Sequence, residues 1–178
     1  LNLGSKKIVT HFEDFKNNFT AIAKLSEVQL SRKIPVFTLA DQPLSVANAV
    51  RATMYPDFKA EKRDFLKSFI EKLGSANILV SEFVETWNKK ERVNIDGFFL
   101  SSNVIVLKRQ QQALRREIFT LAHELGHYLL NEEEVESLDF ADMYGNSGNK
   151  VENWCNEFAF YFLAGKYANT IHQLSTAN

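Results

Sequence analysis

The feature that most constrains this chain is an H-E-x-x-H pattern at residues 123–127, inside a segment with the apolar spacing of a long helix. Residues four apart lie on one face of an α-helix, so His123 and His127 can point at one cation, with Glu124 beside them to handle a proton. The helix is predicted to run from about 112 to 131, with apolar residues at Leu114, Ile118, Leu121, Ala122, Leu125 and Leu129. The pattern indicates a hydrolytic metal site carried by a helix.

A simpler explanation of the same pattern is a solvated polar helix face. At about 100° per residue, His123 and His127 point roughly opposite the centre of the apolar stripe. Two histidines can occupy such a face by chance. The choice between the two interpretations depends on whether the rest of the chain supplies a third ligand.

Composition limits the class of protein. With 178 residues, of which 45% are hydrophobic, the chain is long enough for one compact domain. The net charge of −1, with acids and bases interspersed, argues against direct nucleic-acid binding. Cys155 is the only cysteine, which excludes an internal disulfide, and no apolar run approaches the length of a membrane span. We therefore expect a soluble cytoplasmic protein without a membrane segment.

Apolar periodicity predicts an α+β fold, with helices around a small antiparallel sheet of about three strands. We interpret residues 1–40 as an N-terminal arm or linker, in which Phe12, Phe15 and Phe19 have the spacing of a helix stripe, and residues 41–178 as the domain. Beyond the motif helix, the predicted elements are helices at about 43–55, 61–73 and 150–164 and strands at about 78–84, 97–100 and 104–107. Gly74 is the expected left-handed C-cap of the second helix, and Asn149 the expected N-cap of the last.

The predicted hairpin of the last two strands has two interpretations. Its exposed edge can take a peptide as an added strand. Alternatively, Lys108 and Arg109 blunt that edge, and it binds nothing.

A catalytic zinc normally has three protein ligands and an open fourth position, so a third donor is needed. The metzincin arrangement is excluded, because Leu130 stands where that motif requires glycine and no histidine follows in register. His11 lies in the ambiguous arm, and His172 lies near the end of the sequence. An acidic run follows the motif helix directly and is expected to lie in water, at Glu132, Glu133, Glu134 and Glu136.

The helix predicted at 150–164 offers a better donor. Its apolar stripe comprises Val151, Trp154, Cys155, Phe158, Ala159, Phe162 and Leu163. Glu152 lies about 75° from the centre of that stripe, at the rim of the buried face, whereas Glu157 lies about 145° away and should face solvent. We therefore predict Glu152 as the third ligand.

Asn156 and Cys155 lie near Glu152 on this helix. Asn156, one turn on, points the same way and can accept the second ring N–H of a liganding histidine, although a surface amide explains it equally well. Cys155 lies within the apolar stripe and is expected to be a buried thiol outside the metal site.

These residues resemble a known family. Residues 119–130 read F-T-L-A-H-E-L-G-H-Y-L-L and residues 152–159 read E-N-W-C-N-E-F-A. They resemble the ImmA/IrrE metallopeptidases, whose pattern is H-E-x-G-H followed by E-x-x-A-N-x-F-A. Cys155 replaces the usual alanine, and Ala164-Gly165 follows Leu163 where the family often has proline. The resemblance is strongest over about 97–163, weaker over the two preceding helices, and does not cover residues 1–40.

The resemblance implies a zincin-like domain with His123, His127 and Glu152 as zinc ligands and Glu124 as the catalytic acid and base. The implied activity is that of a zinc-dependent endopeptidase, in which Glu124 activates a metal-bound water. Family members are commonly bacterial or phage-related cytosolic proteins, often joined to or encoded beside a helix-turn-helix repressor that some of them cleave. The expected partner is therefore a protein or peptide substrate, with such a repressor as the candidate.

Two alternative functions and one assignment remain open. A noncatalytic zinc-containing regulatory or protein-binding domain is the main alternative, although a closed structural site has no use for a general base at Glu124. A hydrolase of small amides is the other alternative. The donor to the oxyanion is not assigned among Tyr128, Tyr144, Tyr161 and His172.

Overall fold

The computed structural model describes residues 3–25, 31–56, 61–84, 95–100, 103–109, 113–132 and 146–176. The described helices are α1 (Leu3–Leu25), α2 (Pro43–Met54), α3 (Lys62–Ser75), α4 (Leu114–Leu130), α6 (Asn146–Ala164), the short 3-10 helix η2 (Gly165–Tyr167) and α7 (Ala168–Thr176). The described strands are β1 (Leu79–Val84), β2 (Gly97–Leu100) and β3 (Val104–Arg109). The predicted α+β class, with three strands, is confirmed.

The sheet is mixed rather than antiparallel. Its order is β1-β3-β2; β2 pairs antiparallel with β3, as the predicted hairpin requires, but β1 pairs parallel with β3. The expectation of a purely antiparallel sheet was wrong because side-chain alternation fixes which face a residue lies on and not the direction of its strand. Because β3 is central, Lys108 and Arg109 do not blunt an edge. Arg109 instead binds Glu82 on β1, and its Nε lies 2.9 Å from Oε2 of the buried Glu117 on α4.

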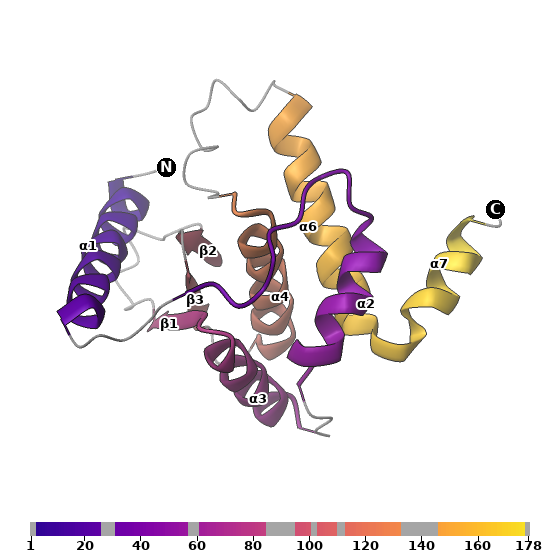
Figure 1. The fold of residues 1–178 in the computed structure, drawn as a ribbon, viewed down its shortest axis with the longest axis horizontal. Coiled ribbons are helices and arrows are strands. Elements are labelled where there is room, and N and C mark those ends of the chain that lie inside the picture. The colour runs from indigo at the N-terminus through magenta and orange to yellow at the C-terminus, as the bar shows by residue number, and fades with distance from the viewer. Residues whose placement is uncertain are drawn as a thin grey trace.

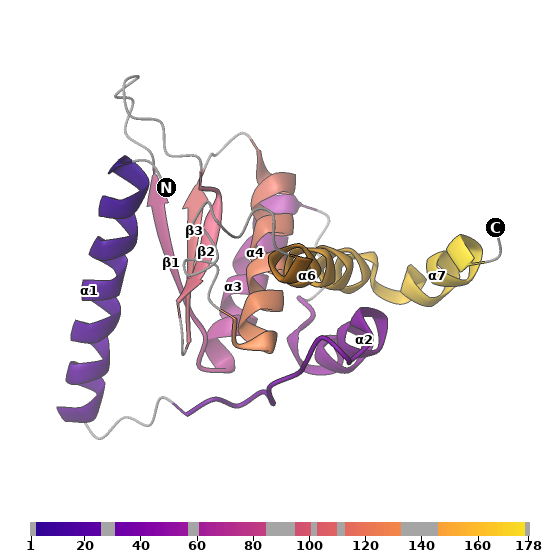
Figure 2. The ribbon, with the colours of Figure 1, turned by 90° about the horizontal axis from the view of Figure 1, so that it is seen from above.

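The sheet separates two apolar layers (Figure 2). On one face, α1 packs on the sheet, and the layer consists of Val9, Phe12, Phe98, Leu100, Val104 and Val106. On the other face, the alternate residues Phe99, Ile105 and Leu107 join the larger core with α2, α3, α4 and α6. Part of the predicted arm is therefore a helix with buried residues. The placement of a domain boundary at residue 41 stays a prediction.

The motif helix α4 lies in the middle of the molecule. The sheet and α3 cover one side of it, and α2 and α6 lie on the other side (Figure 1). As a consequence, every residue from Glu124 to Leu130 is buried. The histidine face of this helix is therefore not the solvated face of the simpler explanation.

Two predicted helix caps lie elsewhere in the structure. Gly74 lies within α3, and the left-handed residue that follows the helix is Asn77, with φ 62°. Likewise, α6 begins at Asn146, so Asn149 lies inside the helix and is not its N-cap. Pro43 occupies the first turn of α2 as predicted.

In the described part of the chain, no helix combines the length and apolar character needed to cross a bilayer.

Candidate metal site

The site forms where α6 crosses α4. Gly126, in the middle of the motif, allows this crossing, because a Cβ added there would lie 3.1 Å from both Cβ and Sγ of Cys155 on α6. Such separations are shorter than ordinary van der Waals contacts. The close approach brings the N-terminal half of α6 beside the histidine face of α4. Cys155 is buried at this crossing, as expected of a thiol outside the metal site.

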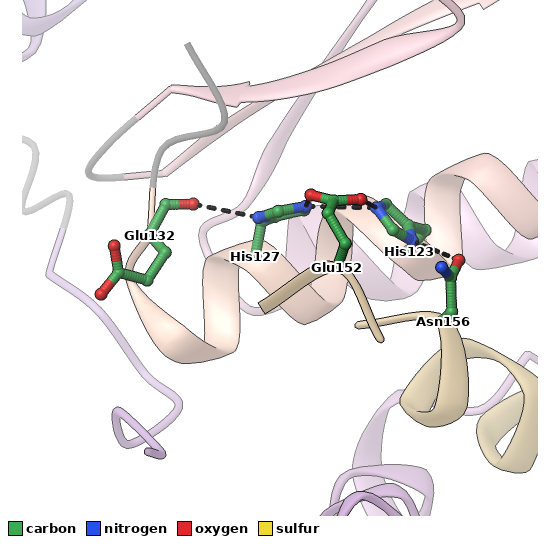
Figure 3. Close-up of polar contacts among 5 residues, drawn as sticks. All are labelled: His123, His127, Glu132, Glu152 and Asn156. Carbon is green, nitrogen blue, oxygen red and sulfur yellow. Dashed lines mark hydrogen bonds and ion pairs between the residues drawn. The ribbon is translucent and has the colours of Figure 1, made fainter. Parts of the chain in front are cut away.

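The three predicted ligands converge at this crossing (Figure 3). Nε2 of His123 lies 3.2 Å from Oε2 of Glu152, and Nε2 of His127 lies 3.1 Å from Oε1. The two Nε2 atoms are 3.1 Å apart. The structure thus brings Glu152 next to two histidines that lie 25 or more positions before it in the sequence.

These separations can be compared with the size of a zinc site. Zinc bonds of about 2.0–2.1 Å in tetrahedral geometry place neighbouring ligand atoms about 3.3 Å apart. The observed spacings of 3.1–3.2 Å are close to that value. Two imidazoles and one carboxylate also form a donor set that catalytic zinc sites use. The geometry is therefore compatible with zinc.

Hydrogen bonds behind the two rings fix which nitrogen carries the proton. Nδ1 of His123 lies 3.0 Å from Oδ1 of Asn156, the contact predicted for that asparagine. Nδ1 of His127 lies 3.2 Å from the carbonyl oxygen of Glu132. Both oxygens act as acceptors, so each Nδ1 donates and each neutral ring keeps its lone pair on Nε2. Both lone pairs then face the same point.

Glu152 stays ionised in this environment. Burial raises the pKa of its carboxyl, but when the imidazoles are also protonated on Nε2, their hydrogen bonds and charge outweigh burial and lower the pKa from 4.5 to about 2. Glu152 is also the most open of the three ligands, with 38% of its side chain exposed against 13% for His123 and 2% for His127. The cluster is therefore accessible from the side of Glu152.

The side chain of Glu124 is buried where α4 packs against β2, with 2% exposure. A Cβ added to Gly97, the first residue of β2, would lie 3.3 Å from Cγ of Glu124 and 2.7 Å from Cγ2 of Thr120. Only glycine fits at this position, because any side chain would meet both residues of α4. Sequence reasoning missed this role of Gly97, because it depends on a contact between distant segments.

Of the other candidate acidic ligands, the two that the structure describes, Glu132 and Glu157, are not part of the cluster. Glu157 is exposed, as predicted. Glu132 is also exposed, and its main chain rather than its carboxylate contacts His127. Glu133, Glu134 and Glu136 lie outside the described residues.

Of the candidate oxyanion donors that the structure describes, Tyr128 is buried in the core, and Tyr161 and His172 contact each other. The ring of Tyr128 packs edge-on against Phe99 in the core, under the guanidinium of Arg32 at 3.8 Å. Tyr161 pairs with His172 at 2.9 Å, and it follows Glu152 by nine residues, or about 13 Å along the helix. Tyr144 lies outside the described residues.

The fold and the site together define a zincin-like domain, in which a helix carrying H-E-x-x-H packs on a small sheet and a later helix brings an acidic residue to the histidines. The chain belongs to the family of the IrrE N-terminal-like domain, a peptidase family, whose model matches residues 74–164, about half of the 178 residues. The matched segment runs from the end of α3 to the end of α6 and contains every residue of the cluster. The predicted ImmA/IrrE membership is confirmed.

Comparison with curated proteins and with solved structures gave no significant match.

Proposed function

We propose that this protein is a zinc-dependent endopeptidase that hydrolyses peptide bonds of a protein substrate. In this proposal His123, His127 and Glu152 hold the zinc, and Glu124 is the catalytic acid and base. The observation that carries the proposal is the convergence of two Nε2 atoms and a carboxylate, 3.1–3.2 Å apart, at the helix that also carries the buried Glu124. Membership of a peptidase family supports the same reaction class.

The residues of the site divide the chemistry between them. Bound zinc supplies a water of lowered pKa and polarises the scissile carbonyl. Glu124 takes the proton from the attacking water as the new C–O bond forms, and gives it to the leaving amine as the C–N bond breaks. Asn156 and the carbonyl of Glu132 hold the two imidazoles in the tautomer that presents Nε2.

The strand β2 is the proposed platform for substrate. In the described sheet β2 pairs only with β3, and its Gly97 lies beside Glu124. A peptide added along an edge strand is held by main-chain hydrogen bonds, which suits a protein substrate of varied sequence. We further propose a helix-turn-helix repressor as the physiological substrate, on the strength of the family resemblance, and the cytoplasm as the compartment.

The first prediction concerns the role of Glu124. The variant Glu124→Gln keeps all three ligands but has no general base, so it should retain about one zinc per chain and lose about 10²–10⁴-fold in cleavage rate. Zinc is measured by elemental analysis of the purified protein. Cleavage is measured by mass spectrometry of new protein N-termini in cells that express the wild type or the variant.

Two outcomes would contradict this assignment. New N-termini that appear equally with both proteins would show that Glu124 is not required. A wild type that binds zinc but generates no new N-termini would favour the alternative, a noncatalytic zinc-containing binding domain. A repressor shortened only in the presence of the wild type would identify the substrate.

A further inference from the structure

The ring of His127 is held from behind by the main chain of Glu132 (Figure 3). Nδ1 of His127 lies 3.2 Å from the carbonyl oxygen of Glu132. A carbonyl only accepts hydrogen bonds, so Nδ1 must carry the proton and the lone pair of the neutral ring lies on Nε2. That Nε2 faces Glu152 and His123. A single main-chain oxygen therefore selects the tautomer able to bind a metal.

The way α4 ends places this oxygen. Asn131, the residue after the helix, is left-handed, with φ 56° and ψ 37°. The turn is closed by Asn131 N–H on the carbonyl of Tyr128 and by Glu132 N–H on the carbonyl of His127, each at 3.1 Å. Glu132 thus bonds His127 twice, through its N–H to the main chain and through its carbonyl to the ring. If residue 131 were helical, the carbonyl of Glu132 would point along the axis and away from the ring.

The side chains of this turn do not make the contact. Asn131 and Glu132 are both exposed, and the carboxylate of Glu132 points away from the imidazole (Figure 3). What residue 131 contributes is its backbone conformation. Glycine and asparagine adopt the left-handed region readily, whereas a β-branched residue does so only with strain.

We propose that Asn131 is a positioning residue of the metal site. Its left-handed conformation turns the carbonyl of Glu132 onto Nδ1 of His127 and so presents Nε2 as a ligand. This inference rests on the proposed zinc site, and it adds a requirement at a residue that lies outside both the H-E-x-x-H motif and α6. The backbone of the turn, and not the side chain of Glu132, makes the contact that orients His127.

The test compares zinc affinity in Asn131→Gly and Asn131→Val, measured by competition with a chromophoric chelator. Glycine preserves the turn, so its affinity should stay within about threefold of the wild type. Valine disfavours the turn and should weaken zinc binding about 10–100-fold, the usual effect of losing a partner of a liganding histidine. In the zinc-loaded valine variant, ¹⁵N NMR should also show faster exchange of the His127 Nδ1 proton with water.

Asn77 offers a matched control for strain alone. It is the other left-handed asparagine among the described residues, with φ 62°, and it follows α3, where its side chain contacts Ser31 rather than the site. Asn77→Val should lower stability but leave zinc affinity as in the wild type. If Asn131→Val fails to fold, Asn131→Ala imposes less strain and should show the same ranking below glycine.

Equal zinc affinity in the wild type and Asn131→Val would overturn the inference, as would an equal loss in Asn131→Val and Asn77→Val. If the wild type binds zinc and cleaves protein but the turn variants match it, only this inference fails. A wild type that binds no zinc would overturn the inference and the proposed function together.

Discussion

Glu152 touches both imidazoles, and it does so with separate oxygens. Oε2 lies 3.2 Å from His123 and Oε1 lies 3.1 Å from His127, so the carboxylate spans the pair. With a pKa of about 2, it is ionised at neutral pH and needs to lose no proton to bind a cation. Glu152 is thus the acidic residue on which the proposed zinc site depends.

The variant Glu152→Gln tests this dependence. It keeps the shape of the side chain but removes the charge, so zinc affinity should fall by more than about 100-fold, beyond the range expected for a residue that only supports a ligand. Glu157→Gln is the matched control, because Glu157 lies on the same helix but is exposed. Titration with a competing chelator measures the zinc affinity of both variants. Equal affinity in the two variants would exclude Glu152 as a ligand.

At the residue scale, much of the site could be predicted from the sequence. Helix periodicity gives the direction of every side chain on a helix, so it singled out Glu152 over Glu157 and paired Asn156 with a histidine ring. The carbonyl of Glu132 could not be predicted in this way. Its position depends on the backbone conformation of Asn131 and not on any side-chain pattern.

At the scale of the elements, the site depends on how closely two helices approach. The backbone of α6 reaches α4 at Gly126, where an added Cβ would lie 3.1–3.2 Å from atoms of Cys155. Helices usually pack with their axes 8–10 Å apart, and small residues at the crossing permit the lower end of that range. Glu152 reaches the histidines because it lies less than one turn before Cys155.

Enlarging Gly126 should therefore move α6 away from the histidines. Gly126→Ala should lower the free energy of unfolding by about 1–3 kcal/mol, the usual cost of overpacking, and should weaken zinc binding. Gly74→Ala is the control, because a Cβ at Gly74 has no neighbour within 4 Å and the residue lies within α3, so alanine should stabilise by about 0.5–1 kcal/mol. Urea denaturation measures both. A Gly126→Ala variant as stable as the wild type would show that the crossing has space for a methyl group.

The helices could be predicted more fully than the sheet. Helix hydrogen bonds join residues four apart, so local periodicity carries the necessary information, and α2, α3, α4 and α6 lie close to the predicted ranges. The partners of β1 are set by contacts between distant residues. Leu79 pairs in register with Val104, on a strand reached only after β2 has formed the other edge. That arrangement, and hence the mixed sheet, was not visible in the alternation of side chains.

At the scale of the whole molecule, the segments before residue 41 support both the sheet and the site. Phe12 on α1 is buried against Phe83 and Phe98, with ring centroids 5.9 Å and 6.1 Å away. Arg32 donates to the carbonyl of Tyr128 at 2.5 Å, and the N–H of Phe37 donates to the carbonyl of Leu129 at 2.9 Å. The last carbonyls of the motif helix are therefore held by a part of the chain that the sequence suggested was only an arm or linker.

Replacing Phe12 tests whether α1 is part of the folded unit. Phe12→Ala should lower the free energy of unfolding by about 3 kcal/mol, because it removes a large side chain from the layer between α1 and the sheet. Phe15→Ala is the control: Phe15 lies on the same helix and is 41% exposed, so its loss should change stability by less than about 0.5 kcal/mol. Urea denaturation followed by circular dichroism distinguishes the two. Equal stability of both variants would support the interpretation of residues 1–40 as an arm.

Anomalous diffraction at the zinc absorption edge, from crystals grown with zinc, shows directly whether His123, His127 and Glu152 bind the metal. We expect one strong peak about 2.0–2.1 Å from Nε2 of His123 and of His127 and about 2.0–2.2 Å from a carboxylate oxygen of Glu152. Glu124 should lie beside the metal without binding it. A zinc ion held by other residues, or crystals in which these three side chains bind no metal at all, would rule out the proposed zinc site.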